Sequence, residues 1–208
     1  MVFSSLTFLF AYLPITLLLY FLVPLKWRNL VLLVESLFFY GWGEPVYITI
    51  MFVSILIDYT HGLLVEKYRD NDKKARWFVG QSVVFNLLLL GFFKYWDFLA
   101  ANLSLLPGVN LPQLNIPLPI GISFFTFQTM SYTIDVYRGL VPPQRNIIDF
   151  GAYVTLFPQL IAGPIVLHSE IVPQFADAQN RHFNFDNFAP GLYAFARGLM
   201  KKVVIADT

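Results

Sequence analysis

The most informative stretch of the chain is residues 117–168, PLPIGISFFTFQTMSYTIDVYRGLVPPQRNIIDFGAYVTLFPQLIAGPIVLH. Its first half is as apolar as a membrane helix, yet it carries polar side chains at Ser123, Thr126, Gln128, Thr129, Ser131, Tyr132, Thr133 and Asp135. A polar side chain in the hydrocarbon of a bilayer is costly unless it faces a partner or a water-filled cavity. We therefore predict that this segment lies inside a helical bundle and borders a passage.

The second half of the stretch contains a helix that proline interrupts. Pro158 and Pro164 flank Gln159, Ala162 and Gly163 within FPQLIAGP, residues 157–164. Backbone that leaves the helix at membrane depth is tolerated only where it is buried in protein or lines a cavity. The sequence therefore predicts a broken or re-entrant helix near 157–164.

The composition is that of a polytopic membrane protein. Of 208 residues, 57% are hydrophobic, 18% are aromatic and 13% are charged, whereas a soluble domain has about 25% charged residues. The net charge of +1 gives no reason to expect nucleic acid as a partner. The chain has no cysteine, which excludes a thiol nucleophile, and no histidine or acidic cluster has metal-ligand spacing.

We predict an all-α integral membrane bundle, with residues 1–208 forming part of one membrane-embedded domain. The first basic residue, Lys26, follows the first apolar run, so that run is expected to be a retained helix and not a signal peptide. Six or seven membrane helices are expected, over residues 5–23, 29–42, 46–65, 77–99, 119–136, 148–161 and 186–205.

Basic residues alternate between the predicted loops. Loops 24–28, 66–76 and 138–145 contain two, five and two of them, and loops 41–45 and 100–117 contain none. Under the positive-inside rule the basic loops are cytoplasmic. We therefore expect a multi-pass protein of the bacterial cytoplasmic (inner) membrane with an extracytoplasmic N-terminus.

Three polar residues of the segment 119–136 share one helical face. Gln128, Tyr132 and Asp135 are four and three residues apart. On a tunnel wall they would hydrogen-bond an acyl carbonyl or an acceptor hydroxyl. The alternative is an interhelical hydrogen-bond cluster, with Asp135 and Arg138 as an interfacial salt bridge.

Two further candidate site residues are Gln159 and Glu35. Gln159 sits at the predicted helix break, where its amide would either contact substrate or satisfy freed backbone carbonyls. Glu35 is an acid within an apolar segment, which makes it a functional candidate, unless a lysine or arginine from another segment pairs with it.

The histidines are candidate general bases, because acyl transfer to a hydroxyl needs a base that titrates near neutral pH. His61 follows Asp58 by three residues, so the two would form a base with its orienting acid, or a structural pair. His168 follows the broken helix and is either a cavity residue or a loop or capping group.

Several motifs resemble the membrane-bound O-acyltransferase family, on the branch of the alginate O-acetyltransferase type. They are MVFSSLTFLF at the start, FFYGWGEPVY at 38–47, PIGISFFTFQTMSYTIDVYRG at 119–139, FPQLIAGPI at 157–165 and GLMKKVVIADT at 198–208. The order of these motifs fits the family along essentially the whole chain. One departure is Leu167, where relatives of this kind often have a basic residue.

The resemblance implies an enzyme that moves an acetyl or similar acyl group across the membrane to hydroxyls of an envelope or extracellular polysaccharide such as alginate. It implies an acyl donor such as acetyl-CoA or an acyl carrier, no further cofactor, and partner proteins of an O-acetylation complex. The family's catalytic histidine lies in a later segment, so the chain is expected to be an N-terminal fragment without a catalytic residue. The alternatives are a transporter or acyl-relay channel without covalent chemistry, and a scaffold subunit.

Overall fold

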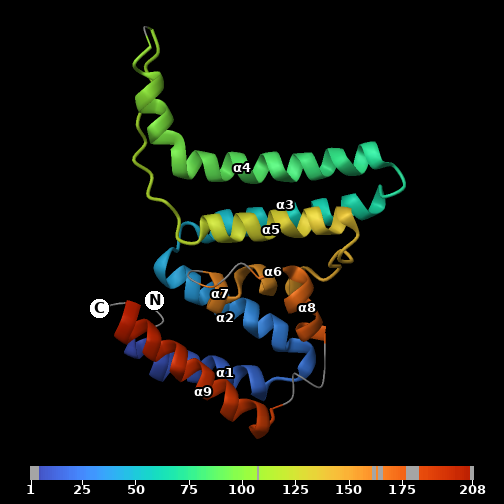
Figure 1. The fold of residues 1–208 in the computed structure, drawn as a ribbon, viewed down its shortest axis with the longest axis vertical. Coiled ribbons are helices and arrows are strands. Elements are labelled where there is room, and N and C mark those ends of the chain that lie inside the picture. The colour runs from blue at the N-terminus through green and yellow to red at the C-terminus, as the bar shows by residue number, and fades with distance from the viewer. Residues whose placement is uncertain (1–4, 107, 161–162, 164–165, 177–182, 207–208) are drawn as a thin grey trace.

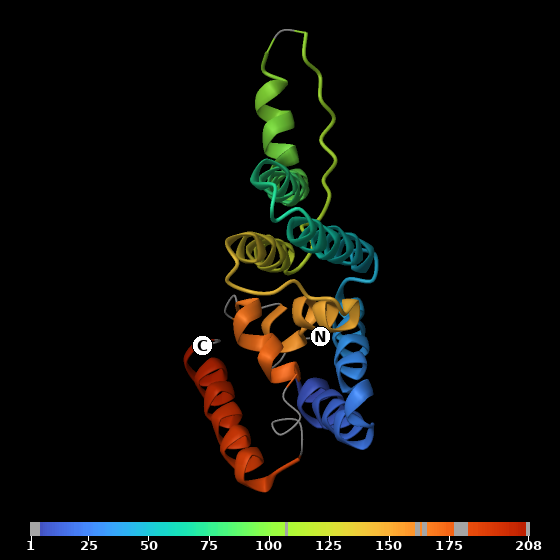
Figure 2. The same cartoon turned by 90° about the vertical axis from the view of Figure 1, so that its right-hand side faces the viewer.

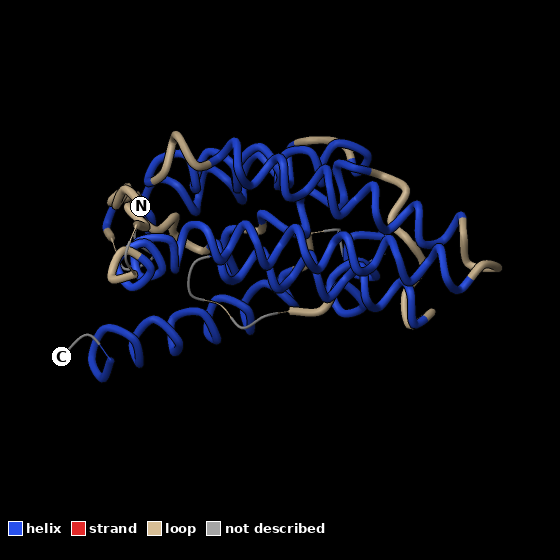
Figure 3. Tube along the Cα trace, turned by 90° about the horizontal axis from the view of Figure 1, so that it is seen from above, coloured by secondary structure: helices blue, strands red, loops and turns tan. Residues whose placement is uncertain are grey.

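The computed structural model describes residues 5–106, 108–160, 163, 166–176 and 183–206. Throughout that part of the chain every regular element is a helix (Figure 3). The predicted all-α fold class is therefore confirmed.

The first six elements run from Phe8 to Leu103. They are η1 (Phe8–Tyr12), α1 (Leu13–Leu22), η2 (Leu25–Trp27), α2 (Arg28–Gly43), α3 (Ile48–Lys67) and α4 (Asp72–Leu103). The η1 turn continues directly into α1, so the two form one apolar helix. Among the described residues, two helices, α3 and α4, are long and apolar enough to cross a bilayer.

The remaining elements are shorter. They are α5 (Ile122–Arg138), α6 (Ile147–Thr155), α7 (Phe157–Leu160), α8 (His168–Ala176), α9 (Phe185–Lys201) and η3 (Lys202–Ala206). Asn146 caps α6, because its side-chain oxygen accepts a hydrogen bond from the Ile148 N–H at 3.0 Å. At the two ends of α5, Gly121 and Gly139 take φ of 77° and 73°, a conformation that glycine adopts without strain.

The helices are stacked in layers (Figures 1 and 2). α4 lies at one edge, α3 and α5 lie side by side beneath it, α2 follows with α6 and α7, and α1 lies beyond α2. The last part of α4 turns away from the bundle, and the chain that follows returns beside it (Figure 1). Asp97 fixes this return, since its carboxylate accepts hydrogen bonds from the backbone N–H groups of Leu114 at 2.8 Å and Asn115 at 3.3 Å.

The predicted helix over 148–161 is wrong as a single helix. α6 ends at Thr155, and Leu156 takes φ −48° and ψ 109°, which is not helical. A continuing helix would need the N–H of residue 158 to reach the carbonyl of Val154, and Pro158 has no N–H. Proline is well tolerated in the first turn of a helix, and Pro158 sits there in α7. The second predicted break involves Pro164, which lies outside the described residues, as do Ile161 and Ala162.

The basic loops meet at one end of the helices. Arg145 contacts Glu66 at 3.3 Å, and the Tyr137 hydroxyl donates to Asp72 at 2.7 Å, so the α3–α4 and α5–α6 loops are neighbours. At the same end, the Asn29 amide donates to Asp149 at 2.7 Å, which joins the first turns of α2 and α6. The alternation seen in the sequence thus corresponds to two distinct ends of the bundle, with the α3–α4 loop at the right in Figure 1.

Candidate functional site

The two predicted glutamines converge on one oxygen. Gln128 of α5 and Gln159 of α7 both donate to the backbone carbonyl of Tyr153 in α6, at 3.1 Å and 2.7 Å. Both side chains are buried, at 4% and 7% exposure. In an unbroken helix that carbonyl would accept from the N–H of Phe157, which instead donates to the hydroxyl of Ser36 at 3.2 Å.

The helix break therefore explains the position of both glutamines. A buried carbonyl without a donor is costly, and the two amides supply donors where the helix does not. The backbone role considered for Gln159 is thus observed, and so is the interhelical bonding considered for Gln128. Whether either also contacts a substrate stays a prediction.

Tyr132 lies further along α5 and is fully buried. Its ring packs 4.6 Å from the ring of Phe150 and 4.7 Å from that of His168, centroid to centroid. Its hydroxyl accepts a hydrogen bond from the Gln144 N–H at 3.0 Å. The side chain of Tyr132 thereby joins α5 to α6, α8 and the loop between α5 and α6.

Asp135 is placed differently from the other two residues of its predicted face. It is partly exposed near the end of α5, and its carboxylate makes no hydrogen bond or salt bridge to any described residue. The salt bridge considered between Asp135 and Arg138 is therefore not formed in this structure. The structure brings Gln128, Tyr132 and Gln159 into the packed interior, with Asp135 at its margin.

His168 is the first residue of α8 and is 3% exposed. α8 is only nine residues long and is not one of the helices that are long and apolar enough to cross a bilayer. The ring of Tyr153 stands perpendicular to the imidazole at 5.1 Å, and His168 Nε2 has no hydrogen-bond partner among the described residues. Burial lowers the pKa of His168 to about 4, so the ring is neutral at neutral pH.

The Asp58–His61 pair expected from the sequence is not formed. His61 Nδ1 lies 2.7 Å from the carbonyl of Ile57 on its own helix. Asp58 is fully buried and bonds instead to two other helices. Ser82 and Asn86 of α4 donate to it at 2.5 Å and 2.8 Å, and Thr133 of α5 approaches at 3.5 Å.

The Asp58 network is the polar cluster that the sequence reasoning missed. A signal was available, because Ser82 and Asn86 are four residues apart and share one face of an apolar segment. All of its donors are neutral, and they fix α4 to α3 and α5 around one carboxylate.

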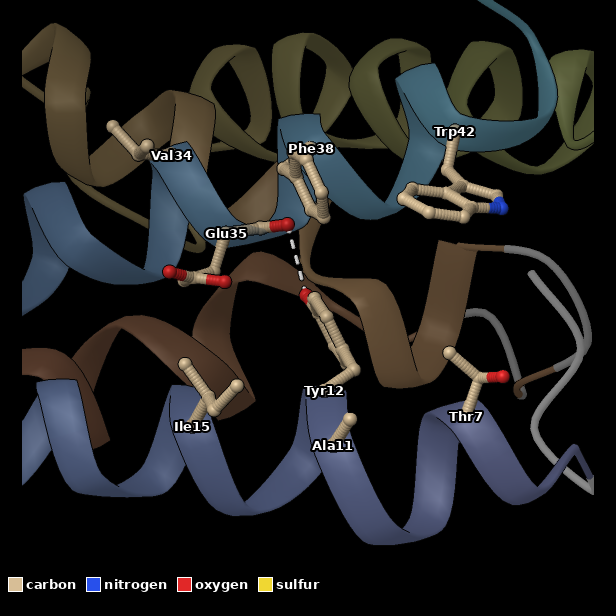
Figure 4. Close-up of a pocket in the computed structure, with 8 residues that line it drawn as sticks. All are labelled: Thr7, Ala11, Tyr12, Ile15, Val34, Glu35, Phe38 and Trp42. Atoms are coloured by element: carbon tan, nitrogen blue, oxygen red, sulfur yellow. Dashed lines mark hydrogen bonds between the residues drawn. The ribbon is translucent and has the colours of Figure 1, made fainter.

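Glu35 lines a groove of about 450 Å³ between α1 and α2 (Figure 4). The Tyr12 hydroxyl donates to the backbone carbonyl of Glu35 at 2.8 Å, and Thr16 donates to its carboxylate at 3.3 Å. Among the described residues no lysine or arginine forms a salt bridge with Glu35, so the pairing considered for it is not observed. The groove is otherwise apolar, and its lining residues are Thr7, Ala11, Tyr12, Ile15, Val34, Glu35, Phe38 and Trp42.

No group of three or more His, Cys, Asp or Glu side chains that could hold a metal ion occurs among the described residues.

Comparison with known proteins gives a consistent picture along the chain. Residues 141–208 match the model of the membrane-bound O-acyltransferase family. A probable alginate O-acetylase of Pseudomonas putida is 42% identical over 100% of this chain and 43% of its own length. One of Azotobacter vinelandii is 41% identical, over 100% of this chain and 42% of its own length.

A third relative is named for a different activity. The peptidoglycan O-acetyltransferase of Helicobacter pylori is 37% identical over 100% of this chain and 45% of its own length. The chain thus spans less than half the length of the curated relatives it matches. No solved structure gives a significant match. Over residues 141–208 by the family model, and along the whole chain by identity to these relatives, this chain is similar to the membrane-bound O-acyltransferase family.

Proposed function

We propose that the full-length protein is an O-acyltransferase of the bacterial cytoplasmic membrane. It transfers an acetyl or similar small acyl group to hydroxyls of an envelope or extracellular polysaccharide such as alginate. The observation that carries this proposal is the 42% identity, over the whole of this chain, to a relative named as a probable alginate O-acetylase. A peptidoglycan O-acetyltransferase at 37% identity supports the same reaction class with a different polymer.

In this proposal, the described part of the chain forms part of the scaffold of the enzyme and part of the wall of the acyl path. Gln128, Tyr132 and Gln159 lie in the packed interior next to the helix break, and Asp135 lies at its margin. We propose that these four residues border the path of the acyl group. The catalytic histidine is proposed to lie on a segment beyond residue 208. Acetyl-CoA or an acyl carrier acts as donor substrate, and no additional cofactor is required.

The orientation proposed for the protein places the end that carries the basic loops in the cytoplasm and the N-terminus outside. The contacts Arg145–Glu66 and Tyr137–Asp72 support this, because they bring two basic loops together at one end of the bundle. The donor would then arrive at that end, and the polysaccharide acceptor with its partner proteins would meet the other.

The second candidate function is a transporter or acyl-relay channel. The helix break at Leu156 favours it, because discontinuous helices form the substrate sites of many transporters. The two functions differ in whether a new ester bond forms. In the enzyme, an acceptor hydroxyl attacks the acyl carbonyl, the donor leaves, and the hydroxyl proton passes to a base.

A reconstitution experiment separates the two functions. Full-length protein is inserted into liposomes with radiolabelled acetyl-CoA inside and a polysaccharide acceptor outside. The enzyme is expected to place label on the polymer as an alkali-labile ester, and replacement of the downstream histidine by alanine should abolish this. Release of unesterified label would support the channel. A complete coding sequence without a histidine in the later segment would overturn the proposed enzyme.

A further inference from the structure

The spacing of two tryptophans on α4 matches the thickness of a bilayer. Trp77 and Trp96 are 19 residues apart, which at 1.5 Å per residue is about 29 Å, close to the thickness of a hydrocarbon core. Tryptophan favours the membrane–water interface. The Trp96 indole donates to the Pro112 carbonyl at 3.1 Å, and the Asp97 carboxylate accepts from the Leu114 N–H at 2.8 Å, so both residues contact the returning chain. The spacing therefore fits Trp77 at one interface and Trp96 at the other.

Basic side chains lie just outside the interface that Trp77 marks. Lys73 precedes Trp77 by one helical turn, which places it about 6 Å further out, at the level of lipid headgroups. A hollow of about 270 Å³ is lined by Lys73, Arg76 and Trp77. Residues 67–76 contain five basic and two acidic side chains, so the surroundings of this hollow are positive.

The two cationic side chains that line the hollow differ in whether they form a salt bridge. The Arg76 guanidinium lies 2.8 Å from Asp72, which also accepts the hydrogen bond from Tyr137, so Arg76 has an acidic partner. Lys73 is exposed and forms no salt bridge with any described residue. Its ammonium is therefore available to an anion.

An apolar face continues from the hollow along the same helix. Trp77, Val84 and Leu88 share one side of the helix and are 66%, 55% and 68% exposed, with the exposed Gln81 between Trp77 and Val84. The opposite face, with Ser82 and Asn86, is the one that packs against α3 and α5. The exposed face points outward, since α4 lies at the edge of the bundle (Figures 1 and 2).

We infer that Lys73, Arg76 and Trp77 bind the phosphate group of an anionic phospholipid whose acyl chains lie along Val84 and Leu88. Positive charge at headgroup depth complements the phosphodiester, and the exposed apolar face complements the chains. A soluble phosphate compound would use the same cations but would leave the apolar face without a partner. The position of the basic hollow and the apolar side chains along one side of α4 therefore favours the lipid.

The test uses purified full-length protein in a neutral detergent. Phosphatidylglycerol is expected to raise the thermal unfolding temperature and to remain bound in native mass spectra, whereas phosphatidylcholine does neither. Lys73→Gln should weaken phosphatidylglycerol binding about fivefold, and Lys73→Arg should keep it. Lys94→Gln, at the other end of α4, is the matched control and should bind as the wild type does.

Three outcomes would overturn the inference. One is equal binding of the two phospholipids. Another is a Lys73→Gln variant with unchanged affinity. The third is competition by millimolar inorganic phosphate or free coenzyme A, which would assign the hollow to a soluble phosphate compound. Should Lys73→Gln fail to accumulate, Trp77→Leu gives a second measurement of the same site, with an expected loss of binding.

Discussion

Tyr132 of α5 lies directly against Gly62 of α3. A Cβ atom at residue 62 would stand 2.6 Å from the Tyr132 hydroxyl oxygen, well inside van der Waals contact. The glycine thus leaves the space that the tyrosine ring fills between the two helices. Because that ring also contacts Phe150 and His168, the close approach of α3 and α5 sets the position of α6 and α8.

The first prediction concerns this contact. Gly62→Ala should force Tyr132 to move and destabilise the full-length protein by about 1–3 kcal/mol, the usual cost of overpacking. Gly80→Ala is the matched control, because Gly80 is exposed on α4 and has nothing within 4 Å of the added carbon. The unfolding temperature in detergent should fall for Gly62→Ala alone. Equal temperatures for the two variants would show that the helices do not approach so closely.

The second prediction concerns the Asp58 network. Asn86→Ala removes donors at 2.8 Å and 3.0 Å from a buried carboxylate, and should cost about 1–3 kcal/mol of stability. Asn102→Ala serves for comparison, since Asn102 is exposed and, within the described part of the chain, its side chain bonds only to the Phe98 carbonyl of its own helix. Loss of monodisperse protein on heating is the readout. A variant at Asn86 as stable as that at Asn102 would mean that the network does not hold α4.

The third prediction concerns the two glutamines at the Tyr153 carbonyl. Gln128→Leu or Gln159→Leu alone leaves that carbonyl one donor, but the double variant leaves it none. The double variant should therefore lose about 1–2 kcal/mol more than the sum of the single variants. A double-mutant cycle of unfolding free energies in detergent measures this coupling. Simple additivity would show that the two amides do not share the acceptor.

The fourth prediction follows from the buried imidazole. Because burial lowers the pKa of His168 from 6.5 to about 4, the unfolded chain binds a proton that the folded protein does not bind between these values. The contribution of the neutral ring to stability is therefore complete above pH 6.5 and is lost as the pH falls toward 4. His168→Phe keeps an aromatic ring and should flatten the fall of unfolding temperature between pH 6.5 and 4.5. The same slope in both proteins would contradict a buried neutral His168.

The sequence predicts the membrane helices well where the chain is mostly apolar. The helix predicted over 46–65 is observed as Ile48–Lys67, since apolar length alone identifies it. The segment predicted over 77–99 is observed as Asp72–Leu103. The first turn of this helix is charged, so a search for apolar segments misses it. The helix begins earlier because Asn71 caps it.

The polar interior is harder to predict, because its partners are distant in sequence. The sequence suggests His61, three residues away, as the partner of Asp58, whereas the observed partners Ser82, Asn86 and Thr133 lie on two other helices. The crowding of polar groups on α5 did indicate a buried segment, and Gln128, Tyr132 and Thr133 are buried. The break in the helix was predicted from proline, but its position at Leu156 depends on which backbone donor Pro158 removes.

The most direct measurement for the proposed acyltransferase is the O-acetyl ester content of the polysaccharide made by cells. Deletion of the gene should remove the ester. The full-length gene should restore it, and a version with the downstream histidine replaced by alanine should not, although its protein accumulates in the membrane. Unchanged acetylation in the deletion strain, or full restoration by the histidine variant, would contradict a polysaccharide O-acyltransferase.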